Sequence, residues 1–367
     1  MSTADLTVLT LGSPEDPSPL RECFDAGLDP AQIVAVIGKT GGTGLGDDPV
    51  RAATVTMIER TIADAAGREM PEIAYVLSGG SPGLITPHIA VITRDREATS
   101  GGLAVGTARS GAISPGDLGR QGHIDAVIAA VGQAQRDADL MDPRRIHAVM
   151  VKSPSLTTES VAELDRRGLS PISRDLGLGP AGAMCFINDA AALGVAAALG
   201  EIDRSAASAS NVHNEFDLFS EVAMTSAGGE RTDIEVIVLG NASDHGGALR
   251  IGHSCTRDPL DLGAVERARV SAGADIDDSI RYAMGKMTLP RTRTVRGNPI
   301  GWHDEAEAAL IAKAMGGALL AATTGDTRVF LSGGEHVSQQ GPADGNPVAV
   351  VFSTAHPAST RRRPPAR

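Results

Sequence analysis

Lysine is scarce in this chain. Of the 33 lysine and arginine residues only four are lysine, and three of these, Lys39, Lys152 and Lys286, stand near the end of a short apolar run. A guanidinium group stays protonated at workable pH, whereas a partly desolvated ammonium group can lose its proton and act as a base. The three lysines are therefore candidates for chemistry. The fourth, Lys313, falls within a helical pattern, and we expect it on a solvated face.

Aromatic residues are also scarce, at 2% of the chain, although the hydrophobic share is 42%. The core must therefore be built from Ala, Val, Ile and Leu, and stacking of bases on aromatic side chains is not expected. The formal net charge is -12. Because nucleic-acid binding depends on neutralisation of phosphates by a basic surface, this charge argues against a nucleic-acid partner.

Cysteine and long apolar runs are missing as well. The three cysteines, Cys23, Cys185 and Cys255, are too few and too scattered for a disulfide framework or a zinc site, and the nine histidines show no metal-ligand spacing. No apolar run approaches the length of a membrane span, and acidic residues stand where a signal peptide needs basic ones. We expect a cytoplasmic protein with no metal, no cofactor and no membrane partner.

What the chain does contain is a threefold internal repeat. Each of the three lysines is followed by a helix-like stretch and then by an apolar run that ends in Ser-Gly-Gly or a near copy. The three endings are Ser78-Gly79-Gly80, Ser226-Ala227-Gly228 and Ser332-Gly333-Gly334. One more β-like run follows each ending. The unit is strand-Lys, helix, strand-Ser, strand, and its unequal spacing excludes a solenoid of short fixed period.

The repeat predicts three α/β units, over residues 1–100, 112–245 and 250–360. The chain is long enough for two or three domains with a large buried core. Glycine and serine are frequent over residues 94–120, which predicts a linker between the first and second units, and a second break is expected over residues 240–258.

Local signals also predict where helices begin. Asp48-Pro49 is typical of a helix start, because proline fits the first helical turn and aspartate caps it. In the second unit, Asn188-Asp189 precedes an alanine-rich run, and we expect the helix to begin there.

Glycine and serine at a strand end suit a site that binds a carbonyl group. Glycine lets the backbone approach a ligand and present its N–H groups, and the serine hydroxyl adds a donor or a nucleophile. A single Ser-Gly-Gly is more often a plain turn, but three copies in register with three lysines favour a site. A desolvated lysine can activate a serine, and ammonium groups that converge lower one another's pKa.

Other catalytic motifs fit poorly. Gly38-Lys39-Thr40 is similar to part of a phosphate-binding loop, but Ile33 and Val34 occupy the region where that motif needs glycine. The chain has neither the Gly-x-Ser-x-Gly of many serine hydrolases nor the Ser-x-x-Lys of β-lactamases. Since no zinc ligands are visible, the pattern favours a Ser-Lys mechanism.

The residues resemble the ring-opening amidohydrolases, the family of cyanuric acid hydrolase and barbiturase. The resemblance follows the family's order along nearly the whole chain. The segments that carry it are Gly38-Lys39-Thr40-Gly41-Gly42-Thr43-Gly44 with Arg51, Ser78-Gly79-Gly80 with Pro87-His88, Val151-Lys152-Ser153-Pro154, Ala192-Leu193-Gly194-Val195-Ala196, Thr225-Ser226-Ala227-Gly228, Val236-Ile237-Val238-Leu239-Gly240, Val295-Arg296-Gly297 and Ser332-Gly333-Gly334.

The resemblance implies three similar α/β domains around a pseudo-threefold axis, with a barrel-like β centre, helices outside and one active site where the domains meet. It implies a small cyclic amide as substrate, a homotetramer, and the middle pair, Ser226 and Lys152, as the catalytic residues. The residues implied to bind the other parts of the ring are Lys39, Arg51, Ser78, Gly79, Ala227, Lys286, Ser332 and Gly333.

Two departures from the family pattern bear on the substrate. The family has an arginine with each Lys-Ser pair, and here only Arg51 is present. The second arginine is replaced in the stretch Ile187-Asn188-Asp189, so Asn188 is expected to bind the substrate instead, and the third stretch, residues 308–314, holds only Lys313. We therefore expect a ring less symmetric than cyanuric acid. A hydrolase of a different lactam or imide and a non-catalytic small-molecule binding protein are the alternatives.

Overall fold

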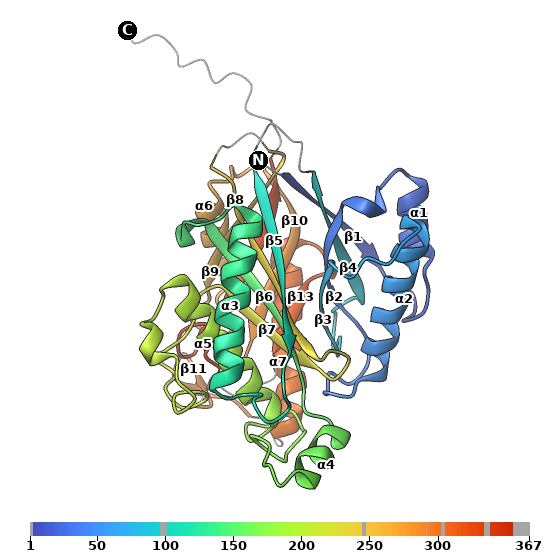
Figure 1. Cartoon of the computed structure of the whole chain (residues 1–367). Coiled ribbons are helices and arrows are strands. Elements are labelled where there is room, and N and C mark those ends of the chain that lie inside the picture. Colours follow the sequence, from blue (N-terminus) through green and yellow to red (C-terminus); the bar gives the residue numbers. More distant parts are fainter. Residues whose placement is uncertain are drawn as a thin grey trace.

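The structure is a computed structural model, and it describes residues 3–95, 101–243, 247–290, 292–301, 305–333 and 338–354. Its main feature is a set of three four-stranded sheets, built one after another along the chain (Figure 1). The first unit comprises β1 (Thr3–Thr10), α1 (Ser18–Asp25), β2 (Ile33–Lys39), α2 (Pro49–Ala66), β3 (Ala74–Ser78) and β4 (His88–Asp95).

The second and third units repeat this order of elements. The second comprises β5 (Leu103–Ala112), α3 (Gln121–Ala138), β6 (Ile146–Pro154), α4 (Thr158–Arg166), α5 (Ala183–Leu199), β7 (Ala223–Gly228) and β8 (Asp233–Asn241). The third comprises β9 (Leu249–Cys255), α6 (Gly263–Ala272), β10 (Ser279–Met287), α7 (Glu305–Thr324), β13 (Phe330–Gly333) and β14 (Pro347–Ser353). Short additions are the hairpin β11 (Thr294–Val295) with β12 (Asn298–Pro299) and the 3-10 turns η1 (Pro30–Gln32), η2 (Pro143–Arg145) and η3 (Arg204–Ala206).

The strand order is the same in all three sheets. The strands are arranged β1-β4-β2-β3, β5-β8-β6-β7 and β9-β14-β10-β13, so the first strand of each unit lies at one edge and the third at the other. The second and third strands of each unit are parallel, and the helix that joins them crosses over the sheet. This recurrence accounts for the internal repeat in the sequence.

The sheets face one another at the centre, and the helices lie outside (Figure 1). One cluster of buried residues takes side chains from all three sheets, among them Ile37, Met150 and Met284. Separate clusters fill the space between each sheet and its own helices. These layers use mostly aliphatic side chains, as the shortage of aromatic residues requires. The predicted α/β fold of three similar units is confirmed.

The structure corrects two local predictions. The stretch expected as a linker over residues 94–120 contains β5, because alternate residues such as Leu103 and Val105 face the central core, although the strand also contains two glycines. The helix expected to begin at Asn188-Asp189 begins instead at Ala183, so Asn188 lies inside α5. The Asp48 cap before α2 is confirmed, since its side chain accepts a hydrogen bond from Val50 N–H at 3.1 Å.

The limits expected for the three units stay predictions. The strand β5 begins at Leu103, before residue 112, where the second unit was expected to start. Gly334 of the third Ser-Gly-Gly lies outside the described residues. Among the helices that the structure describes, none combines the length and the apolar character needed to cross a bilayer.

Candidate active site

Each predicted lysine lies directly opposite its predicted serine. Lys39 pairs with Ser78, Lys152 with Ser226 and Lys286 with Ser332, in each case between the parallel second and third strands of a unit. Side chains of directly paired residues in neighbouring strands lie on the same face of a sheet. The repeat therefore places three ammonium groups beside three hydroxyl groups at the carboxyl ends of the strands.

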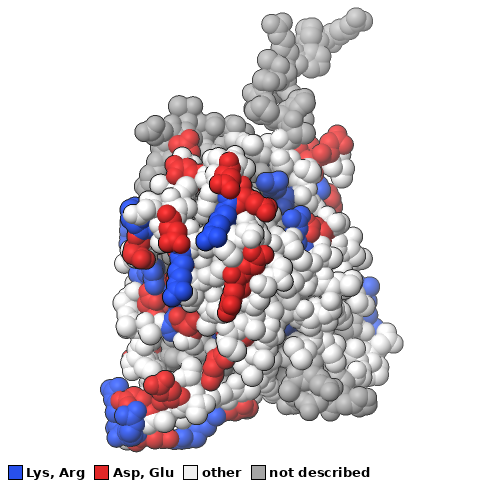
Figure 2. Space-filling model, turned by 90° about the vertical axis from the view of Figure 1, so that its right-hand side faces the viewer, with Lys and Arg blue, Asp and Glu red and all other residues white. Residues whose placement is uncertain are grey.

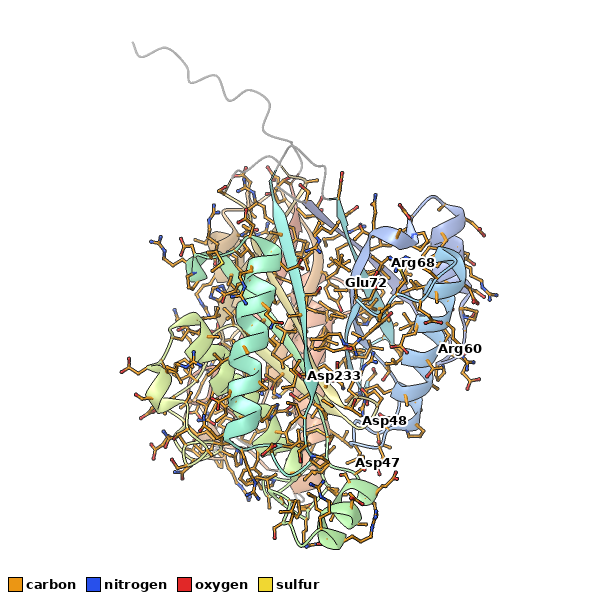
Figure 3. All side chains as sticks on the ribbon, in the orientation of Figure 1. Asp47, Asp48, Arg60, Arg68, Glu72 and Asp233 are labelled. Atoms are coloured by element: carbon orange, nitrogen blue, oxygen red, sulfur yellow. The ribbon has the colours of Figure 1, made fainter. Side chains whose placement is uncertain are left out.

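The loop after β2 brings Arg51 to the same end of the first sheet. Asp48, at the start of α2, accepts a hydrogen bond from Gly44 N–H at 2.8 Å and so folds this loop back. Figure 3 shows Asp47 and Asp48 at the lower end of the first unit and Glu72 near its upper end. A side chain at Gly79 would collide with the Asp48 carboxylate, so the close approach of these two segments requires glycine there.

The first pair makes a direct hydrogen bond. Lys39 Nζ lies 3.2 Å from Ser78 Oγ and 3.0 Å from the Gly79 carbonyl oxygen, and the lysine is fully buried. Burial lowers the pKa of Lys39 well below its ordinary value, and the nearby cations Lys313, Arg51 and Lys152 lower it further. A neutral amine beside a serine hydroxyl is the arrangement that a lysine general base needs.

The second pair is arranged differently. Lys152 Nζ donates to the Leu77 carbonyl oxygen at 2.9 Å and forms an ion pair with Glu230 Oε1 at 2.9 Å. Among the described residues no hydrogen bond joins Lys152 to Ser226. Burial lowers the pKa of Lys152 to about 8, although Glu230 opposes this shift. Lys152 therefore reaches from the second unit to the strand that carries Ser78.

Arg51 shares the carboxylate that holds Lys152. Its Nε lies 2.8 Å from Glu230 Oε1, and its Nη2 donates to the carbonyl oxygens of Leu45 and Gly46. Burial alone would raise the pKa of Glu230, but Lys152 and Arg51 lower it to about 2. Glu230 is therefore ionised at neutral pH, and it joins the first unit to the second.

The third pair, Lys286 and Ser332, is also buried. Ser332 Oγ donates to the Thr225 carbonyl oxygen at 3.3 Å, which links the third unit to the residue before Ser226. Thr225 Oγ1 in turn donates to the Asn188 carbonyl oxygen at 3.0 Å, so Asn188 adjoins the middle serine strand. Gly333 ends β13. Ala227 packs its methyl group into a small apolar cluster, which leaves its backbone as the part able to bind a ligand.

Lys313 contradicts the prediction of a solvated face. Its side chain, on α7 of the third unit, is only 3% exposed. A methyl group at Gly44 would lie 3.0 Å from Lys313 Nζ and 3.1 Å from the Gly79 carbonyl oxygen, so the ammonium group approaches the loops that surround Lys39. The stretch that lacks the third family arginine thus still supplies a cation to the site.

Sequence reasoning also missed Glu230. It follows Ser226-Ala227-Gly228-Gly229 directly, in the turn between β7 and β8, and a charged residue in a glycine-rich turn is usually solvated. One signal was available: Glu230 follows the predicted catalytic Ser226 closely in the sequence, and a carboxylate near that serine can pair with the predicted lysine, Lys152.

A hollow of about 730 Å³ lies elsewhere, between the first and second units, and is lined by Glu72, Arg94 and Arg109 among others. It includes the first residues of β2, whereas the lysines lie at the opposite ends of their strands. We therefore assign the site from the convergence of the Lys-Ser pairs and not from the size of a cavity.

Comparison with known proteins places this arrangement in a family. Residues 5–353 match the family model described as amidohydrolase ring-opening protein. The chain is 40% identical to a cyclic amide hydrolase of Pseudofrankia inefficax, covering 95% of this chain and 94% of that protein. It is 35% identical to a cyanuric acid amidohydrolase of Rhizobium leguminosarum bv. trifolii, covering 92% and 94%.

Solved structures agree with these relatives. The crystal structure of cyanuric acid hydrolase from A. caulinodans superposes with a TM-score of 0.89 at 31% identity, covering 97% of this chain and all of that one. A second cyanuric acid hydrolase structure, described as an innovation by structural concatenation, has a TM-score of 0.88 at 31% identity, covering 96% of this chain and 100% of the other. The chain therefore belongs to the ring-opening amidohydrolase family.

Proposed function

We propose that this protein hydrolyses a C–N bond in a small cyclic amide or imide, with a serine as nucleophile and a buried lysine as base. The observation that carries the proposal is the pairing of buried lysines with serines at three strand ends, in a chain whose family opens such rings. A cyanurate- or barbiturate-like ring presents several carbonyl and N–H edges, which three similar units can bind.

In the proposed mechanism Lys152 takes the proton of Ser226, and Ser226 Oγ attacks a ring carbonyl. Backbone N–H groups stabilise the oxyanion, and one such donor typically contributes about 3 kcal/mol to transition-state binding. The ring C–N bond then breaks, and the proton on Lys152 passes to the leaving nitrogen. Water hydrolyses the resulting ester and restores the serine.

One contact favours a second assignment of these roles. Lys39 is already hydrogen-bonded to Ser78, and no carboxylate of the described residues forms an ion pair with it, whereas Lys152 is paired with Glu230. In this second assignment Ser78 attacks and Lys39 is the base, while Lys152 stays protonated and binds a carbonyl oxygen. Both assignments describe the same overall reaction.

The remaining side chains are proposed to bind the ring. In the first assignment Lys39, Ser78 and Gly79 hold one edge, and Lys286, Ser332 and Gly333 hold another. Arg51 and Asn188 complete the first and second edges. Asn188 carries no charge and suits a neutral amide edge better than an anionic oxygen.

Turnover of a panel of rings tests the proposal. Cyanuric acid, barbituric acid, a simple cyclic imide and a lactam are each incubated with the purified protein, and loss of ring absorbance is followed. Turnover of any of these rings supports ring-opening hydrolysis. Turnover of cyanuric or barbituric acid supports a substrate with several carbonyl edges, and turnover of the lactam or the simple imide alone supports the alternative of a different substrate on the same fold. Saturable binding by calorimetry without turnover would show a non-catalytic binding protein and refute the proposal. The proposed tetramer is tested separately by light scattering.

A further inference from the structure

A single carboxylate oxygen joins a predicted catalytic lysine and a predicted substrate-binding arginine from different units. Glu230 Oε1 accepts from Arg51 Nε of the first unit at 2.8 Å and pairs with Lys152 Nζ of the second at 2.9 Å. All three side chains are almost completely buried, at 1%, 1% and 5% exposure for Arg51, Lys152 and Glu230. Removing one partner of a buried ion pair destabilises a protein strongly, because the other charge is left buried and uncompensated.

The charges around Lys152 come from three parts of the fold. Glu230 and Arg231 lie in the turn after β7, Arg51 comes from α2, and Lys39 comes from β2. Of these groups only Glu230 is negative, so it is the one that favours the ammonium form of Lys152. Arg51, Arg231 and Lys39 all act in the opposite direction.

The geometry also limits what Lys152 can do. A lysine ammonium group has three N–H donors. Two point at the Leu77 carbonyl oxygen and at Glu230 Oε1, so one position on Nζ remains, as an N–H of the ammonium form or as the lone pair of the neutral amine. The position of Lys152 Nζ is thereby fixed before the substrate arrives, which is how a preorganised site avoids the cost of reorientation during the reaction.

We propose that Glu230 is a positioning residue, which holds the Lys152 side-chain nitrogen and the Arg51 guanidinium group in place at the junction of the first and second units and leaves one position on Lys152 Nζ for Ser226 or the substrate. The proposal rests on the proposed function for its kinetic consequences. The effect of Glu230 on the titration of Lys152 does not depend on that function and can be measured without turnover.

Two substitutions separate the charge of Glu230 from its position. Glu230→Gln removes the charge and keeps the shape. Gly228→Ala keeps the charge, but its methyl group would collide with the Glu230 carboxylate and push this flexible side chain away from Lys152. Glu59→Gln is the matched control, since Glu59 on α2 pairs with Arg231 at 3.0 Å and is half-exposed.

The first readout is the titration of Lys152 itself. The chain has only four lysines, so protein labelled with ¹³C at lysine Cε gives few signals, and Lys152→Arg identifies the one from Lys152. We expect the pKa of Lys152 to fall by about one unit or more in Glu230→Gln, because an opposite charge at this distance shifts a pKa by roughly one to three units. Gly228→Ala should lower it in the same direction, and Glu59→Gln should leave it unchanged.

The second readout is the pH profile of kcat/KM on the best substrate of the panel. In Glu230→Gln we expect kcat/KM to fall about tenfold or more and the limb due to Lys152 to move to lower pH, with Glu230→Asp recovering part of the rate.

A Lys152 signal that titrates alike in the wild type, Glu230→Gln and Gly228→Ala would overturn the inference, even if the enzyme is active. If the wild type turns over no ring, the proposed function fails, and the Lys152 titration still decides the role of Glu230. If Glu230→Gln does not fold, as judged by circular dichroism, the Lys152 titration and the pH profile of kcat/KM are measured on Gly228→Ala instead.

Discussion

Lys39 and Ser78 lie opposite each other in neighbouring parallel strands, and Lys39 Nζ is 3.2 Å from Ser78 Oγ. Lys152 and Ser226 have the same register, yet the lysine is bound to Glu230 and to the Leu77 carbonyl oxygen. Three copies of one strand pattern have thus produced two different hydrogen-bond arrangements. Which serine attacks the substrate is the first question for experiment.

Serine substitutions answer that question. We predict that Ser226→Ala and Lys152→Ala each abolish turnover, whereas Ser78→Ala and Ser332→Ala weaken substrate binding more than chemistry. Steady-state kinetics with calorimetric binding measures the two effects separately. If Ser78→Ala loses as much kcat as Ser226→Ala while still binding the ring, the nucleophile is assigned wrongly and the Lys39-Ser78 hydrogen bond marks the catalytic pair. A double loss far from additive would show that serine and lysine act as a unit.

Lys152→Arg tests the base directly. The pKa of Lys152 is about 8, so if its neutral amine is the active form, kcat/KM should rise with pH up to about that value and then level off. Arginine keeps the charge but cannot release its proton at workable pH, so Lys152→Arg should lose nearly all activity. An active arginine variant across this range would mean that Lys152 contributes only charge.

Lys313→Met tests the cation that the sequence placed wrongly. Lys313 is one of the charges that lower the pKa of Lys39, so its removal should raise the pKa of Lys39. Lysine-labelled protein reports this shift by NMR, and Lys313→Arg, which keeps the charge, is the control. If Lys39 is the base, the acid limb of kcat/KM moves to higher pH in Lys313→Met only. An unchanged Lys39 titration would contradict the proximity of the two ammonium groups.

Substrate specificity follows from the unequal units. The family resemblance implies an arginine in each unit, and this chain has Asn188 in that stretch of the second unit and Lys313 in that of the third. A buried site that pairs a given edge rejects rings that leave its groups unpaired, often by orders of magnitude. We predict that cyanuric acid has a lower kcat/KM than a less symmetric cyclic imide such as barbiturate. The reverse order would mean that Asn188 and Lys313 replace the missing arginines fully.

Helix packing on the second sheet gives a prediction about stability. A methyl group at Gly106 of β5 would collide with the backbone of α3 at Ala134 and Ala138, whereas one at Gly111 of the same strand meets no atom within 4 Å. Overpacking of this kind typically costs about 1–3 kcal/mol. Gly106→Ala should therefore lower the free energy of unfolding in urea by that amount, and Gly111→Ala should not. Equal effects of the two would show that α3 can move away from the sheet.

The repeat was visible in the sequence because strands and helices alternate in the same order three times, and because corresponding strands end in the same residues. Runs such as residues 33–39 and 146–152 have the β-branched composition of buried strands. A lysine at the end of such a run is unusual, and this singled out the three positions. The direct pairing of Lys39 with Ser78 depends on the parallel register of β2 and β3, which the structure shows. The strand β5 was missed because its glycines and serines are those of a loop, and only its partner β8 reveals it.

Lys313 and Glu230 were not predictable in the same way. The helix α7 has apolar residues on most of its circumference, so the pattern does not show which face is buried around Lys313. The position of Glu230 depends on Arg51, which is distant in the sequence and meets it only because two units adjoin. Long-range ion pairs of this kind have no local signal.

The burial of all four lysines has a consequence for the outside of the molecule. Lys39, Lys152, Lys286 and Lys313 are at most 3% exposed, so the basic side chains that Figure 2 shows in blue on the face of the first unit are arginines. Amine-reactive reagents such as succinimidyl esters, which depend on exposed lysines in most proteins, find no lysine side chain to modify on this surface. The lysine side chains become available to such reagents only when the sites in which they are buried open, so slow acylation of the folded protein would report that opening.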